Sequence, residues 1–275
     1  MRKAQDRGQM TDILSYGFMQ RAFIAGIALA IFSGIISVFI VLRRVAFLGS
    51  GISHSAFGGV AIGFILGINP LITALIYCIV VAFAIEVIST KGRLAEDASI
   101  GIFLSGSMAM GVVLIGLSKN YTVDLFGYLF GSILAISSGD AYMAVGMAAV
   151  IMVTLMAIMK DLLFITFNED IAVVAGVPVR LMKSIFLVSI AVAIVIGIKI
   201  VGIILMSALL VIPGATAKLL TKKFYPMLIL SSAAAVFSTI SGLIISYQYD
   251  LPSGGMIIIA LSAIFALSFL KKIYG

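Results

Sequence analysis

The sequence predicts an all-α, polytopic transmembrane protein with about nine spanning helices, and two observations carry that prediction. Of the 275 residues, 63% are hydrophobic and 11% are charged, whereas a soluble domain has roughly 45–50% and about 25%. The charges also bound apolar runs of roughly 20 residues, the length that crosses a bilayer. A soluble fold of this size could not bury so much apolar surface, which excludes secreted, cytosolic globular and nucleic-acid-binding proteins. The single cysteine, Cys78, lies in an apolar run and excludes a disulfide framework.

The charge-free runs define the predicted spans of one transmembrane domain over residues 1–275. Residues 45–85 are long enough for two crossings and break at Asn69-Pro70, because the residue before a proline disfavours the helical conformation. Only Lys199 interrupts residues 184–217, which are expected to form two short spans that meet there. Residues 121–138 are too short and too rich in Gly and Ser for a span, and predict a re-entrant or surface-lying element. The spans are 22–42, 45–85 (two), 98–118, 141–159, 184–217 (two), 224–246 and 254–270.

The basic residues predict the orientation of the chain in a cell membrane. Alternate loops contain most of the Lys and Arg, and the positive-inside rule places those loops in the cytoplasm. The N-terminus is then outside and the C-terminus is cytoplasmic, although the N-terminal segment is itself basic. The cytoplasmic set is Arg43, Arg44, Lys91, Arg93, Lys160, Arg180, Lys183, Lys218, Lys222, Lys223, Lys271 and Lys272.

A short cytoplasmic helix is predicted within residues 163–180, LFITFNEDIAVVAGVPVR. Asn168 is a suitable N-cap, and the helix dipole favours acidic residues such as Glu169 and Asp170 in the first turn. Ile171, Val174 and Ala175 form a small apolar face, and Gly176 with Pro178 ends the helix. The segment is either a connecting helix on the membrane surface or an element that docks into a soluble partner.

Several stretches together resemble one family, the permease subunits of metal-ion ABC transporters that import zinc, manganese or iron. NEDIAVVAGVPVR resembles the coupling loop that such permeases insert into a groove of an ATPase subunit. The resemblance implies an architecture similar to the cobalamin-type importer permeases with one fewer helix at the start. It also implies a second copy of the chain, cytoplasmic ATP-binding subunits and an extracytoplasmic metal-binding protein as partners, besides the bilayer. The other matching stretches are VLRRVAFLGSGISHSAFGGVAIGFILG (41–67), VDLFGYLFGSILAISSGD (123–140), VGIILMSALLVIPGATAKLL (201–220) and SYQYDLPSGG (246–255).

The resemblance assigns the coupling role to the loop, and the chain itself is expected not to be an enzyme. No G-x-x-x-x-G-K-[ST] loop is present to bind the phosphates of a nucleotide, so ATP hydrolysis is expected on another polypeptide. The residues expected to couple to that ATPase are Asn168, Glu169, Asp170, Gly176, Val177 and Pro178.

The one histidine, His54, is the main candidate on the metal pathway. An ionisable residue at membrane depth is a functional hypothesis by default, and a neutral imidazole binds divalent metals. The alternative is a packed imidazole bonded to a carbonyl. The resembled motif has a histidine here and commonly an aspartate four residues earlier, where this chain has Ser50, a weaker ligand. A small-residue ridge that lets another helix approach closely lies on a different face: Gly51, Ser55, Gly59, Gly63 and Gly67.

Other ionisable residues have structural and functional interpretations. Asp124 and Asp250, on the outer side, either cap helices or attract cations to the entrance. Asp140 is expected to cap the span that it opens, and Glu86 to reach the cytoplasmic surface near Lys91 and Arg93. Lys199 is expected at the outer interface.

Pro213 and Gly214 predict a break and a candidate hinge in the seventh span, because a proline frees a backbone carbonyl. The alternative is a helix end just before Lys218. The scattered methionines are expected to be apolar filler rather than a soft-metal site.

The predicted function is the membrane-spanning permease subunit of an ATP-driven importer of a divalent cation, zinc or manganese, with iron as a further option. No resident cofactor is expected, only the transported metal, and no nucleic-acid partner. The alternative is a secondary transporter or channel that ATP does not drive, which would normally show two related halves. An intramembrane hydrolase using Ser53 and His54 is disfavoured, because adjacent helical residues point about 100° apart.

Overall fold

The computed structural model describes residues 15–92, 94–117, 127, 131 and 136–274. Over these residues the regular secondary structure is helical, as predicted. The predicted re-entrant element at 121–138 lies almost wholly outside the described residues. The helices are α2 (Gly17–Leu42), α3 (Ala46–Leu66), α4 (Pro70–Lys91), α5 (Glu96–Leu117), α7 (Ser138–Phe167), α8 (Glu169–Val174), α9 (Val179–Leu209), α10 (Ile212–Leu220), α11 (Phe224–Tyr249) and α12 (Ser253–Tyr274).

The described part of the chain contains nine helical stretches that are long and apolar enough to cross a membrane, in agreement with the prediction. The break at Asn69-Pro70 is confirmed, since Asn69 Oδ1 accepts a hydrogen bond from the amide of Leu71 and Pro70 opens α4. The fifth span is longer than predicted. α7 continues past Lys160 to Phe167. Its 30 residues make a helix of about 45 Å, which exceeds a hydrocarbon core of about 30 Å, so one end of α7 extends beyond the core.

The sixth and seventh spans, Val179–Ile198 and Ile200–Leu220, meet at Lys199 as predicted, and the non-helical residue of α9 lies three positions further on, at Gly202. Gly202 has φ 85°, a conformation that glycine adopts without a Cβ clash. Beyond this turn the chain folds back, and the side chain of Met206 lies against Gly197. A lysine marks the polar end of a span, but the backbone reverses where a residue tolerates a positive φ.

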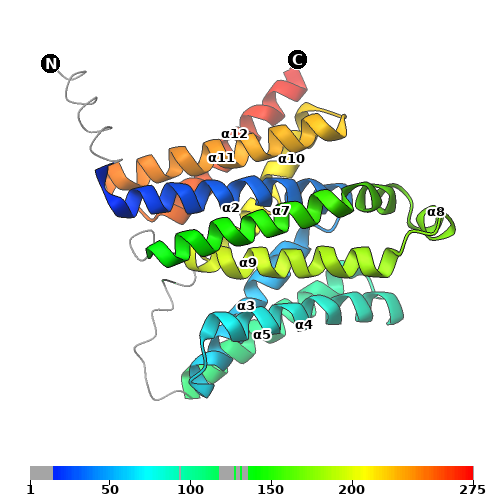
Figure 1. Cartoon of the computed structure of the whole chain (residues 1–275), viewed down its shortest axis with the longest axis horizontal. Helices are drawn as coiled ribbons and strands as arrows, with labels where there is room; N and C mark the ends of the chain where they lie inside the picture. Colours follow the sequence, from blue (N-terminus) through cyan, green and yellow to red (C-terminus); the bar gives the residue numbers. More distant parts are fainter. Residues whose placement is uncertain (1–14, 93, 118–126, 128–130, 132–135, 275) are drawn as a thin grey trace.

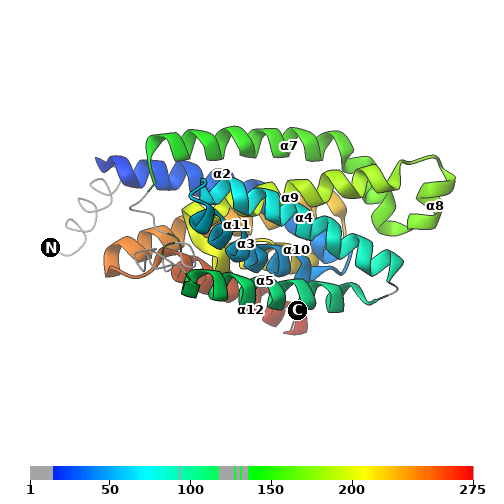
Figure 2. The same ribbon diagram turned by 90° about the horizontal axis from the view of Figure 1, so that it is seen from below.

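The helices form two groups joined by α9 (Figure 1). α3, α4 and α5 pack on one another, and α10, α11 and α12 pack together with α2. α9 contacts both groups and also α7. In the perpendicular view, α7 runs along one face and α5 and α12 run along the opposite face (Figure 2). A fully buried aromatic contact links α2 to α9, with the rings of Phe39 and Phe186 edge to face at 6.0 Å.

The two ends of the bundle differ. α8 projects beyond the spanning helices at one end, where α4 also finishes (Figure 1). We call this the α8 end. α2 begins at the opposite end, which we call the far end.

Candidate functional site

The small-residue ridge of α3 packs against two neighbouring helices, as predicted. A Cβ added to Gly51 would clash with Ile100 of α5, and one added to Gly59 or Gly63 would clash with α4. Ser55 Oγ donates a hydrogen bond to the carbonyl of Phe103 on α5, 3.4 Å away. Gly67 does not extend the ridge, because it ends α3 in the left-handed conformation. The ridge therefore places α3 at the centre of its group.

A different face of α3 stays open. From Leu48 to Ala61 every residue is buried except Ser50 and His54, which are half-buried. Phe47, which is 62% exposed, lies three residues before Ser50, so the three side chains share one helical face. We call Phe47, Ser50 and His54 the open strip. The open strip ends at Phe57, whose ring lies against Gly111 of α5. It therefore begins at the α8 end and runs for about 12 Å along α3.

His54 itself contains an unsatisfied polar atom. Its Nδ1 is buried and has no hydrogen-bond partner among the described residues. Buried polar atoms in proteins are normally paired, so an orphan requires an explanation such as an ion or ligand. Across the described ranges no three His, Cys, Asp or Glu side chains gather into a metal cluster. The alternative for His54 was a packed imidazole that is bonded to a carbonyl. In the described part of the chain, Nδ1 makes no such bond.

Of the two acidic residues predicted at the outer side, the structure describes only Asp250, which lies apart from His54. Asp124 lies outside the described residues. Asp250 is the exposed C-cap of α11, with φ 52°, and borders a cavity of about 310 Å³ at the far end together with Phe18 and Tyr247. Asp140 is the third residue of a capping box in which Ser137 is the N-cap, so the expectation that Asp140 is the cap itself is corrected.

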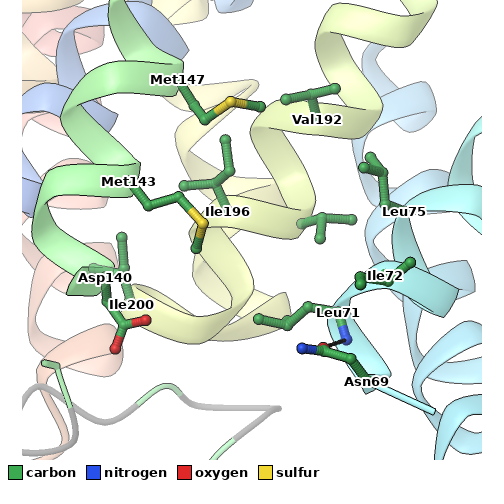
Figure 3. A pocket seen from close by; sticks show the side chains of 11 residues that line it. Asn69, Leu71, Ile72, Leu75, Asp140, Met143, Met147, Val192, Ile196 and Ile200 are labelled. Carbon is green, nitrogen blue, oxygen red and sulfur yellow. Dashed lines mark hydrogen bonds between the residues drawn. The ribbon is translucent and has the colours of Figure 1, made fainter.

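An apolar cavity of about 300 Å³ lies between α4, α7 and α9 (Figure 3). Met143 and Met147 of α7 face Val192 and Ile196 of α9 across it, and its polar side chains, Asn69 and Asp140, stand toward one end. Such a lining offers little to a hydrated cation. Met143 and Met147 belong to this apolar lining, and the interpretation of the scattered methionines as filler stays a prediction.

Pro213 and Gly214 lie in the first turn of α10, next to a bend at Leu210 and Val211. The break in the seventh span therefore precedes the proline, which begins a helix rather than interrupting one. Gly214 packs directly on the backbone of Ser37 in α2, and its amide donates a 2.8 Å hydrogen bond to Ser37 Oγ. This contact fixes α10 to α2, and the hinge role stays a prediction.

Gly214→Ala is expected to destabilise the fold, because the new Cβ would lie within van der Waals distance of the Ser37 backbone, which cannot shift cheaply. Overpacking of this kind costs about 1–3 kcal/mol, equivalent to a fall of at least about 2 °C in the thermal midpoint. Thermal unfolding of the purified protein in detergent measures this. The control is Gly146→Ala on α7, where an added Cβ meets nothing within 4 Å. Equal midpoints for the two variants would contradict the assignment.

The short helix predicted within 163–180 is present as α8, although residues 163–167 belong to the end of α7. Asn168 caps it, with Oδ1 accepting a hydrogen bond from the amide of Ile171 at 3.0 Å. Gly176, with φ 83°, ends it as predicted, and the amide of Val177 bonds back to the carbonyl of Ala172. Pro178 is the N-cap of α9.

The apolar face of α8 is not covered by the described chain. Ala172 is fully buried and holds the helix against its neighbours, whereas Ile171, Val173 and Val174 are 55%, 58% and 88% exposed. An exposed apolar cluster at the tip of a projecting element indicates an interaction site. Of the two interpretations of this segment, the geometry favours the docking element.

The sequence did not predict that several charged side chains from different helices gather at the α8 end. Arg43, the C-cap of α2, lies over the ring of Phe186, 5.7 Å from its centroid. Burial lowers the pKa of Arg43 from its usual value, while the carboxylates of Glu96, Glu169 and Glu86 act in the opposite direction. Glu86 lines a small cavity together with Arg43 and Glu96, and its expected place near Lys91 and Arg93 stays a prediction, because Arg93 lies outside the described residues. The only signal in the sequence was charge close to span ends.

These features define a membrane-spanning transport subunit. In the described part of the chain, one of the nine spanning helices, α3, presents a histidine on an open face, and the short helix α8 projects at one end. The chain belongs to the ABC 3 transport family, whose model matches residues 15–272. It is accordingly a permease of an ABC transporter and not itself an enzyme.

Known proteins are similar to this chain over almost its whole length. The manganese transport system membrane protein MntC of Halalkalibacterium halodurans is 36% identical over 258 residues, 94% of this chain and 88% of that protein. The manganese import system permease protein ScaB of Streptococcus parasanguinis is 35% identical over 92% of this chain and 90% of its own length. The solved structure of PsaBC from Streptococcus pneumoniae in complex with Fab contains a chain 34% identical, with a TM-score of 0.86, covering 97% of this chain and 98% of that one.

A more distant structure, an inward-facing conformation of a metal-chelate type ABC transporter described as putative, shares the fold at 14% identity with a TM-score of 0.71.

Proposed function

We propose that this chain is the membrane-spanning subunit through which Mn²⁺ enters the cell, driven by ATP hydrolysis on a separate subunit that docks on α8. The observation that carries the proposal is the open strip of α3, with its half-buried histidine and unpaired Nδ1. Imidazole nitrogen and hydroxyl oxygen are ligands that a divalent first-row metal accepts. The manganese transport roles in the names of two relatives at 35–36% identity support the choice of metal.

The open strip suits a pathway shared by two copies of the chain. The sequence has one histidine, and one imidazole with one hydroxyl is a weak ligand set. Two copies related by a two-fold axis would place two His54 and two Ser50 side chains along one channel. Such a set binds a cation weakly enough to release it, which a translocation site requires.

The proposal includes an orientation and further partners. The α8 end is cytoplasmic, since α8 and most of the basic loops belong there under the positive-inside rule. The N-terminus is then outside and the C-terminus inside. At the far end, a metal-binding protein delivers the cation near the Asp250 cavity. Asp124, which lies outside the described residues, stays a candidate for attracting cations on the outer side. ATP binding by the docked subunits moves α8 and exposes the pathway alternately to each side.

The test is metal uptake by vesicles that contain this chain, its ATP-binding subunit and its metal-binding protein. We expect Mn²⁺ to enter only with ATP, and faster than Zn²⁺ or Fe²⁺ at equal concentration. Entry of Zn²⁺ or Fe²⁺ in preference to Mn²⁺ would retain the class and change the cargo. Metal entry that follows the gradient equally with and without ATP would replace the proposal with the secondary transporter or channel.

A further inference from the structure

Lys183, one turn into α9, connects α8 to the spanning helices. Its Nζ lies 2.6 Å from Oε2 and 2.7 Å from Oε1 of Glu169, the first residue of α8. Exposed ion pairs stabilise a protein little, but the Lys183 side chain is only 15% exposed. This contact is therefore shielded from water on the α9 side and joins α8 to a spanning helix by a route other than the peptide chain.

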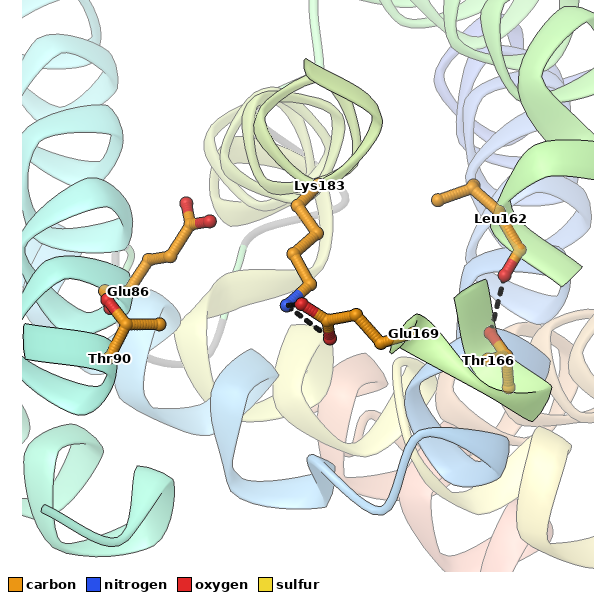
Figure 4. A network of polar contacts seen from close by, with 6 residues as sticks. All are labelled: Glu86, Thr90, Leu162, Thr166, Glu169 and Lys183. Atoms are coloured by element: carbon orange, nitrogen blue, oxygen red, sulfur yellow. Dashed lines mark hydrogen bonds and ion pairs between the residues drawn. The ribbon is translucent and has the colours of Figure 1, made fainter. Parts of the chain in front are cut away.

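The same lysine also borders a cluster of charges inside the bundle. A cavity of about 60 Å³ is lined by Lys183 together with Arg43 of α2, Glu86 of α4 and Glu96 of α5. Figure 4 shows Lys183 descending from α9 between Glu86 on one side and Glu169 on the other, with its ammonium on Glu169. Glu96 interacts electrostatically with both Arg43 and Lys183. Lys183 thus stands between the carboxylate of α8 and those of α4 and α5.

This position matters because α4 and α5 are the helices that pack on α3. Glu96 opens α5, which covers Gly51 and closes the open strip at Phe57. Glu86 lies on α4, which packs on the same ridge at Gly59. A shift of the Lys183 charge toward or away from Glu86 and Glu96 therefore acts on the two helices that pack on α3, one of which closes the strip.

We propose that Lys183 is the positioning residue that transmits movement of α8 into the bundle: it pairs with Glu169 in the present conformation and turns to Glu86 and Glu96 when α8 is displaced. The inference rests on the proposed function for what moves α8. Without Lys183, α8 is free to swing about Asn168 and Gly176, and its displacement no longer reaches α4 and α5.

The first test uses the complete complex in vesicles and measures Mn²⁺ ions taken up per ATP hydrolysed. Lys183→Met and Glu169→Gln are each expected to lower this ratio roughly fivefold or more, and the double variant no further, because both remove the same interaction. Lys183→Arg, which keeps the charge, is expected to retain about half of the ratio or more. The matched control is Lys160→Met, at an exposed lysine on α7.

A ratio for Lys183→Met equal to the wild type, or losses that multiply in the double variant, would overturn the inference. So would Lys183→Arg behaving like Lys183→Met, since the role assigned is one of charge. If the wild-type complex takes up Mn²⁺ without ATP, the proposed function fails instead, and the ratio is not the deciding measurement.

The second test needs no transport and decides the inference in that case too. Hydrogen–deuterium exchange of the purified chain is compared between wild type and Lys183→Met, with Lys183→Gln as a second variant. We expect faster exchange both in α8 and at the α8 end of α4, residues 86–91. Faster exchange in α8 alone would mean that Lys183 only anchors the docking helix, and would overturn the transmission role.

Discussion

Val174→Asp is expected to weaken docking of the ATP-binding subunit about 30-fold and to abolish ATP-driven uptake. Val174 is 88% exposed on α8 and lies beside Ile171 and Val173, which are more than half exposed. Burying a valine side chain in such an apolar contact contributes roughly 1.5–3 kcal/mol. An aspartate there would be buried without a partner on docking, which adds a desolvation penalty. Co-purification with the ATP-binding subunit and uptake in vesicles measure the two effects.

Two variants control for this result. Val174→Thr keeps the shape and adds only a hydroxyl, so it is expected to cost far less than the aspartate. Leu251→Asp introduces the same charge at the far end, in the turn after α11, where Leu251 is 45% exposed, and should leave ATPase binding unchanged. Normal docking and uptake by Val174→Asp would show that α8 is a connecting helix only.

His54→Ala is expected to slow Mn²⁺ uptake by at least roughly tenfold, while the protein still assembles in the membrane. Disturbing the environment of a metal ligand commonly costs 10- to 100-fold in affinity, and removing the imidazole removes the ligand itself. Uptake at limiting Mn²⁺, normalised to the amount of complex, measures the change. The half-buried position of His54 and the lack of a partner for its Nδ1 among the described residues are the observations behind this expectation.

The neighbouring residues provide the comparison. Ser53 is fully buried with an unpaired hydroxyl, and Ser53→Ala on the adjacent face should leave uptake unchanged. Ser50→Asp lies four residues from His54 on the same face and should increase retention of Mn²⁺, because a carboxylate is a stronger ligand than a hydroxyl. Unchanged uptake by His54→Ala would make the histidine a packing residue.

The sequence by itself determined the class of fold and most element boundaries. Charges separate apolar runs that are long enough to span a bilayer. Such runs are stable as helices in the hydrocarbon core, so nine spans followed from composition and spacing alone. Local chemistry also decided the caps. Asn168 and Gly176 bound α8 as predicted, since a side-chain oxygen and a positive φ act within a few residues of chain.

The sequence also identified the packing ridge of α3, because small residues four apart must lie on one face. It marked His54 as the candidate ligand, because it is the only histidine in the chain. What it could not determine was whether the histidine face is covered. Ser50 and His54 are open and Phe57 is closed because of where α5 crosses α3, which depends on contacts between residues far apart in the chain.

Only the tertiary structure decided the remaining features. The backbone turn next to the junction of the sixth and seventh spans falls at Gly202, since the folded-back chain requires a positive φ there. Ser37 and Gly214 meet across 177 residues of sequence. Lys183 reaches Glu169 and borders Glu86 and Glu96 because α4, α5, α8 and α9 converge at one end of the bundle. Patterns along the chain report which side chains share a helix face, whereas pairing between helices depends on packing that no local pattern encodes.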